Sequence, residues 1–105
     1  YRSFKTGVRV ESHTPSTIAD GLRTVLGVKN FEVIRSSAKD ILLVSEDEII
    51  DAMVLVWSRL KQVVEPSSAV TLAAVLRNPD VFKGQRVGLV LTGGNVDVED
   101  LPFNR

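Results

Sequence analysis

The stretch Thr92-Gly93-Gly94-Asn95 has the clearest potential for chemistry in this sequence, because it follows directly on the apolar run Val87–Leu91. Glycines let a backbone approach a ligand closely, and a threonine hydroxyl can donate or accept a hydrogen bond. The same residue types also form simple turns. On its own the motif therefore leaves two alternatives open, a ligand-binding loop and a turn.

Glu65 is the second candidate, because it directly precedes Pro66 and lies between two apolar stretches. A carboxylate in such surroundings is costly to bury unless it is paired or hydrogen-bonded. The alternative is that Glu65 caps the helix that follows.

The other ionisable residues do not form a recognisable catalytic or metal site. His13 is the only histidine and lies in a polar, irregular stretch, with no partner placed near it by the sequence. The lysines lie in polar contexts, so none resembles a desolvated, activated amine. The acidic run Glu46-Asp47-Glu48 is better explained as the first turn of a capped helix than as a cation site. We therefore name no catalytic residue and no metal ligand.

Composition excludes several classes of protein. The 105 residues include 13 basic and 13 acidic side chains, so no broad attraction to nucleic acid or to an anionic membrane is expected. There is no cysteine, which excludes disulfides and thiolate metal sites. No apolar run is long enough to span a bilayer, and the N-terminus does not resemble a signal peptide. We expect a cytoplasmic protein. Because the sequence begins with Tyr1 and not with an initiator methionine, we also expect it to be a segment of a longer chain.

The chain divides into elements that could position the two candidates. Two strands buried on both faces are predicted, over 41–44 and 86–91, because most of their residues are apolar. Ser45 and Glu48 form a capping box that begins a predicted helix over 46–64, with Trp57 on its apolar stripe. Pro66 can open the next helix, which is apolar almost all round over 69–76 and is therefore predicted to be fully buried.

The remaining segments give weaker signals. A short helix is predicted over 31–38 with Asn30 as its cap and Phe31 on its apolar face, whereas residues 1–16 are predicted to be irregular. The order strand, helix, helix, strand indicates an α/β fold with parallel strands. Two strands cannot complete such a sheet, so residues 1–105 are expected to be an incomplete part of a larger domain. Ligands bind beyond the carboxyl ends of parallel strands, where Thr92 falls.

Four separated stretches resemble one family. "TIADGL" (17–22), "DILLVSEDEI" (40–49), "VVEPSSAVTLAAVL" (63–76) and "GLVLTGGNVD" (88–97) occur in this order and at similar spacing in serine and threonine dehydratases and serine racemases. These are pyridoxal-phosphate enzymes of the tryptophan-synthase-β-like fold, also called fold type II. The resemblance implies that residues 1–105 are the C-terminal portion of a three-layer αβα large domain that binds the cofactor.

The resemblance also implies roles for the candidate residues. Thr92 matches a serine of the family whose hydroxyl hydrogen-bonds the pyridine nitrogen of pyridoxal 5'-phosphate. Gly93 and Gly94 would keep the loop tight beneath the ring, and Glu65 would support the cofactor pocket. Ser68 departs from the pattern, because many members have glycine there. The catalytic lysine and the phosphate-binding loop lie upstream in the family, so this chain alone is expected to be inactive.

The activity implied is that of a lyase in amino-acid metabolism. It would convert a hydroxy-amino acid to a 2-oxo acid and ammonia by β-elimination, or racemise serine. The implied partners are the amino-acid substrate, the remainder of the large domain, the small domain and a second subunit in a homodimer. A divalent cation is also allowed, with its ligands upstream of Tyr1. The alternative is a standalone, non-catalytic α/β module that binds a small molecule or another protein.

Overall fold

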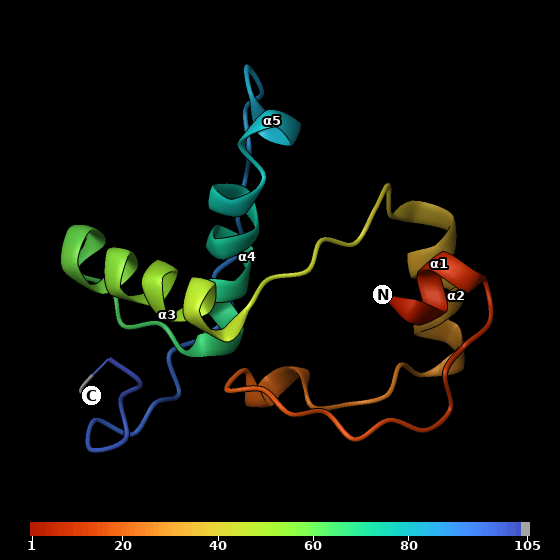
Figure 1. The fold of residues 1–105 in the computed structure, drawn as a ribbon, viewed down its shortest axis with the longest axis horizontal. Coiled ribbons are helices and arrows are strands. Elements are labelled where there is room, and N and C mark those ends of the chain that lie inside the picture. The colour runs from red at the N-terminus through yellow and green to blue at the C-terminus, as the bar shows by residue number, and fades with distance from the viewer. Residues whose placement is uncertain (104–105) are drawn as a thin grey trace. The chain divides into compact units, whose positions relative to one another are not determined.

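The computed structural model describes residues 1–103, which form helices joined by non-helical segments (Figure 1). They divide into two compact units, one made of residues 1–16 and 23–43 and the other of residues 17–22 and 44 onward. In chain order the elements are α1 (Arg2–Thr6), η1 (Asp20–Leu22), α2 (Val28–Ser37), α3 (Glu46–Leu55), η2 (Val56–Leu60), α4 (Pro66–Arg77) and α5 (Pro79–Phe82). In the part of the chain that is described, no helix is both long and apolar enough to cross a membrane.

The first unit consists of α1 and α2, which pack against each other. The prediction that residues 1–16 are irregular is wrong for α1, because a helix of five residues is too short to show a period. Gly7 ends α1 with a left-handed backbone at φ 73°. The buried Ser3 hydroxyl accepts a hydrogen bond from the Val10 N–H at 2.9 Å, which holds the following segment to the helix.

Helix α2 begins three residues earlier than predicted. Its N-cap is Gly27, whose backbone is extended, and Asn30 lies inside the first turn instead of capping it. The Phe31 N–H donates to the Gly27 carbonyl at 2.9 Å. The first helical turn therefore precedes Phe31, the residue at which the apolar pattern begins. Phe31 is buried, as its place in the pattern predicted.

An exposed ion pair joins α1 to the segment after α2. Lys5 donates to the Asp40 carboxylate at 2.7 Å, and this hydrogen bond lowers the pKa of Asp40 and raises that of Lys5. Because the pKa of Asp40 is lower in the folded state, the ion pair stabilises the fold at pH values above the ordinary carboxyl pKa. This stabilisation is lost as the pH falls through the lowered pKa of the folded state. Since both groups are exposed, the contribution to stability is small.

The second unit has its core between α3 and α4, which pack against each other (Figure 1). The predicted capping box is confirmed at the start of α3. The Glu48 N–H donates to the Ser45 hydroxyl at 3.3 Å, and the Ser45 N–H donates to the Glu48 carboxylate at 2.8 Å. The buried apolar core consists of Ala19, Ile49, Ala52, Met53, Val56, Val64, Ala69, Ala73 and Leu101.

The helix predicted over 46–64 ends early. Helix α3 passes into the π-helical turn η2, and Lys61 then takes a left-handed backbone with φ 55°. The chain turns back after this point, so that the Trp57 indole N–H donates to the Val64 carbonyl at 2.9 Å. The turn buries Val64 in the core and leads the chain to Glu65. Trp57 itself is half-buried and packs against the core, as predicted.

Pro66 is the first residue of α4, as predicted from its fixed φ angle. The prediction that this helix is fully buried is wrong for the structure described. Only one face of the helix is buried, and its buried residues are Ser68, Ala69 and Ala73, whereas Leu76 is 52% exposed. Within its unit, α4 packs mainly against α3, with fewer contacts to η1 and to the short α5 that follows it, and this packing covers one side of the helix.

Neither predicted strand, 41–44 or 86–91, is paired into a sheet within residues 1–103. A strand is defined by hydrogen bonds to a neighbouring strand, and both runs lack such a neighbour in the described part of the chain. Their apolar side chains are accordingly open, with Leu43 62% exposed and Val90 71% exposed. A strand inside a parallel sheet would be covered on both faces. The helices between the two runs, α3 and α4, follow the predicted order.

Candidate functional site

The loop that begins at Thr92 lies against the start of α4, within the second unit. The Thr92 N–H donates to the Ser68 hydroxyl at 3.0 Å, and the Glu65 N–H donates to the Gly93 carbonyl at 3.1 Å. Two hydrogen bonds therefore hold consecutive residues of the loop to the turn Glu65–Ser68. The structure thus brings together the two candidate sites that the sequence presented separately.

The role of the two glycines is the space they leave and not an unusual backbone angle, because neither Gly93 nor Gly94 has a positive φ. A Cβ atom built on Gly94 would lie 2.5 Å from the carbonyl oxygen of Val63. A Cβ atom built on Gly93 would lie 2.5 Å from Oε1 of Glu65. The contact at Gly94 is with backbone, so only glycine lets the loop pass this closely to Val63, whereas the contact at Gly93 is with the end of a flexible side chain that can move.

Glu65 occupies the N-cap position of α4, and its carbonyl accepts the N–H groups of Ser68 and Ala69 at 3.0 and 3.1 Å. Glu65 is therefore the capping residue by position, as the alternative held, but its side chain makes no capping hydrogen bond. The half-buried carboxylate lies beside Gly93 instead. Thr92, which precedes that glycine, is exposed to solvent.

Ser68 is the residue at this site that the pattern did not single out as functional. It is only 1% exposed, and its hydroxyl accepts the hydrogen bond from Thr92. The sequence feature that marks this position is the serine itself, because many members of the family have glycine there. Its partner lies 24 residues away in the chain, which local sequence patterns cannot reveal.

The acidic run at the start of α3 has structural roles. The Glu46 carboxylate accepts the Ile18 N–H at 2.7 Å, and Glu48 completes the capping box and pairs with Arg77 at 2.8 Å. These contacts agree with the interpretation of the run as a capped first turn. Among residues 1–103, no group of three or more histidine, cysteine, aspartate or glutamate side chains is arranged to hold a metal ion.

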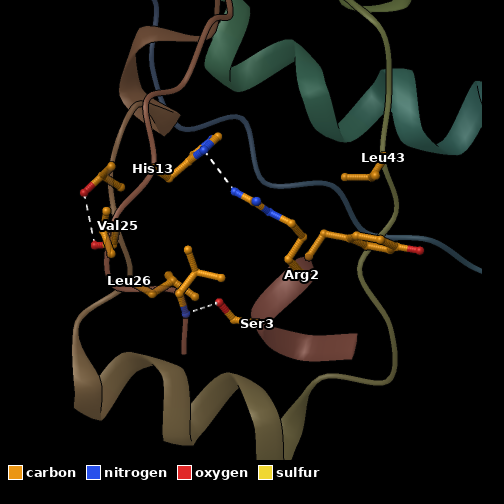
Figure 2. A pocket seen from close by; sticks show the side chains of 9 residues that line it. Arg2, Ser3, His13, Val25, Leu26 and Leu43 are labelled. Atoms are coloured by element: carbon orange, nitrogen blue, oxygen red, sulfur yellow. Dashed lines mark hydrogen bonds between the residues drawn. The ribbon is translucent and has the colours of Figure 1, made fainter. Parts of the chain in front are cut away.

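A pocket of about 460 Å³ lies in the first unit (Figure 2). Arg2 reaches across it from α1, and its guanidinium makes a 3.0 Å hydrogen bond with Nδ1 of His13. Most of the remaining lining is apolar, including Val25, Leu26 and Leu43. His13 thus has an arginine as its partner, which does not prepare an imidazole to act as a general base. None of the four candidate site residues lines this pocket.

Comparison with known proteins identifies the family of this chain. A family model described as pyridoxal-phosphate dependent enzyme matches residues 1–93. The chain belongs to the pyridoxal-phosphate-dependent enzymes. The match ends at Gly93, so it includes Glu65 and Thr92, and the resemblance stated from four motifs is confirmed.

Curated relatives match nearly the whole chain. A β-hydroxyaspartate dehydratase of Paracoccus denitrificans is 47% identical over 104 residues, which is 99% of this chain and 33% of that protein. A serine racemase of Dictyostelium discoideum is 45% identical over 106 residues, which is 96% of this chain and 32% of that protein. The chain therefore spans about a third of the length of these relatives.

Solved structures give the fold. The serine racemase of Dictyostelium discoideum superposes with a TM-score of 0.84 at 45% identity, covering 93% of this chain and 32% of that one. A threonine deaminase superposes with a TM-score of 0.83 at 43% identity, covering 91% and 33%. The chain has the fold of a segment that makes up about one third of the length of each of these fold type II enzymes. The predicted fold class is therefore confirmed.

Proposed function

We propose that this chain is the C-terminal portion of the large, cofactor-binding domain of a hydroxy-amino-acid dehydratase, or of a serine racemase. The observation that carries the proposal is the 47% identity to a β-hydroxyaspartate dehydratase across 99% of the chain. An L-threo-3-hydroxyaspartate ammonia-lyase of a Pseudomonas species, 48% identical over 99 residues, supports the same substrate class.

The residues at the Thr92 loop fit the cofactor that the family uses. Thr92 is exposed, so its hydroxyl can reach a ligand, while its backbone is held by Ser68. We assign that hydroxyl to the pyridine nitrogen of pyridoxal 5'-phosphate. Gly93 and Gly94 hold the loop close to residues 63–65, and the Glu65 carboxylate supports it from beside Gly93.

The chemistry at this site depends on which group faces the pyridine nitrogen. When bound, the cofactor withdraws electrons from the bonds at the α-carbon of the amino acid. A hydroxyl such as that of Thr92 does not hold the nitrogen protonated, unlike a carboxylate. The weaker electron withdrawal suits loss of the β-hydroxyl or exchange of the α-proton. The lysine that binds the cofactor is assigned to the remainder of the protein, so the 105 residues alone are proposed to be inactive.

The complete protein is proposed to be a cytoplasmic homodimer in which this segment packs against the remainder of the large domain and a small domain. A divalent cation, if it is used, is assigned to acidic ligands upstream of Tyr1. These assignments follow the resemblance to serine and threonine dehydratases and serine racemases.

The test of the activity uses the full-length protein with its cofactor. L-threo-3-hydroxyaspartate, L-threonine, L-serine and D-serine are supplied separately, 2-oxo acid and ammonia are quantified, and serine enantiomers are separated chromatographically. We expect equal amounts of 2-oxo acid and ammonia, with 3-hydroxyaspartate the preferred substrate. Failure to convert any of these amino acids, in a protein that retains its cofactor, would exclude both the dehydratase and the racemase.

A further inference from the structure

We infer that Ser68 is a positioning residue that sets the orientation of Thr92 toward the cofactor, and this inference rests on the proposed contact between Thr92 and the pyridine ring. Ser68 belongs to the first turn of α4 and is 1% exposed. A buried hydroxyl without a hydrogen-bond partner is costly, so the partner of this one matters. That partner is the backbone N–H of Thr92, at 3.0 Å.

The hydrogen bond acts on the residue whose hydroxyl faces the cofactor. It fixes the N–H side of Thr92, while the Glu65 N–H fixes the carbonyl of the next residue at 3.1 Å. With its backbone held on both sides, Thr92 presents its side chain from a fixed point. A hydroxyl that is already oriented does not lose that freedom again when the cofactor binds.

The helix supplies the rigid support for this contact. The Ser68 N–H donates to the Glu65 carbonyl at 3.0 Å, and the Thr71 hydroxyl donates to the Ser68 carbonyl at 3.1 Å. Ser68 is therefore held by α4 itself, whose neighbouring residue Ala69 is fully buried in the core. Glycine or alanine at this position would leave the Thr92 N–H without its side-chain acceptor.

Ser67 provides a matched control in the same helical turn. Its hydroxyl also accepts a backbone N–H at 3.0 Å, that of Gly21, and it lies 3.4 Å from the Asp20 carboxylate. Ser67→Ala therefore removes a hydrogen bond from a backbone N–H to a serine hydroxyl at the start of α4, but one that is more exposed and that holds η1 and not Thr92. A general loss of helix stability would affect the two variants alike.

The experiment compares Ser68→Ala, Ser67→Ala and Thr92→Val in the full-length protein. In the cofactor-free protein, we expect Ser68→Ala to speed amide hydrogen exchange at Thr92 about three- to tenfold, with no change in Ser67→Ala. In titrations with pyridoxal 5'-phosphate, we expect Ser68→Ala to raise the Kd about three- to tenfold and to shift the absorbance of the bound cofactor. Ser67→Ala is expected to leave the Kd and the absorbance unchanged.

The outcomes separate the inference from the function on which it rests. If Thr92→Val raises the Kd and Ser68→Ala does not, Ser68 is only structural and the inference is overturned. Equal effects of Ser67→Ala and Ser68→Ala on the Kd would overturn it as well. If Thr92→Val leaves both the Kd and the absorbance unchanged, the proposed contact with the cofactor itself is wrong, whatever Ser68 does.

Discussion

Gly94→Ala is expected to displace the Thr92 loop and to abolish most of the activity of the full-length enzyme. The new Cβ would lie 2.5 Å from the Val63 carbonyl oxygen, which is backbone and cannot rotate away. Overpacking of this kind costs about 1–3 kcal/mol of stability. Because the loop is proposed to contact the cofactor, its misplacement is expected to lower kcat/KM on the order of 100-fold. Thermal unfolding and steady-state kinetics measure the two effects.

Gly93→Ala is the matched control for this substitution. Its Cβ would also lie 2.5 Å from an atom, but that atom is Oε1 of Glu65, the end of a flexible side chain. The carboxylate can rotate away, so a loss of less than about 1 kcal/mol is expected. If Gly94→Ala were as stable and as active as Gly93→Ala, the close approach to Val63 would not determine the shape of the loop.

The 105-residue chain in isolation is expected to associate or to unfold without cooperativity. The run 86–91 is unpaired, and Val87, Leu89, Val90 and Leu91 are all at least 38% exposed. An unpaired apolar strand is a template for pairing with another chain. Sedimentation velocity at several concentrations, together with thermal unfolding, measures this directly. A monodisperse monomer that unfolds cooperatively would contradict the expectation.

Two lysine substitutions test whether the run itself is responsible. Val90→Lys places a charge in the unpaired segment and is expected to reduce association. Val33→Lys is the control, because Val33 is similarly open at 62% exposed but lies on α2, outside the run. Equal effects of the two charges would show that association does not depend on the segment 86–91.

The sequence predicted those features that depend on short-range signals. The Ser45–Glu48 capping box and Pro66 at the start of α4 are both present, because each depends on residues within one turn of a helix. The end of α3 was missed, since it depends on a left-handed Lys61 and on the hydrogen bond from Trp57 to Val64. Neither leaves a signature in the apolar pattern, which continues at helical spacing through residue 64.

The strands and the contacts within the site depend on residues that are far apart in the chain, so the sequence predicted them less well. An apolar run predicts a strand, but pairing requires a neighbour, and runs 41–44 and 86–91 have none within residues 1–103. Thr92 and Glu65 were named from the sequence, through the glycines, the proline and the family resemblance. That Ser68 bonds the Thr92 N–H could not be predicted, because the two residues are brought together only by folding.

The central claim, that the Thr92 hydroxyl contacts the cofactor, is tested most directly by comparing Thr92→Val with Thr92→Ser in the full-length protein. Valine keeps the shape of threonine and loses the hydroxyl, whereas serine keeps the hydroxyl and loses the methyl group. The measurement is the Kd for pyridoxal 5'-phosphate and the absorbance of the bound cofactor. We predict that Thr92→Val raises the Kd about three- to tenfold and shifts the absorbance, while Thr92→Ser resembles the wild type. A Thr92→Val protein with unchanged Kd and absorbance would contradict the account.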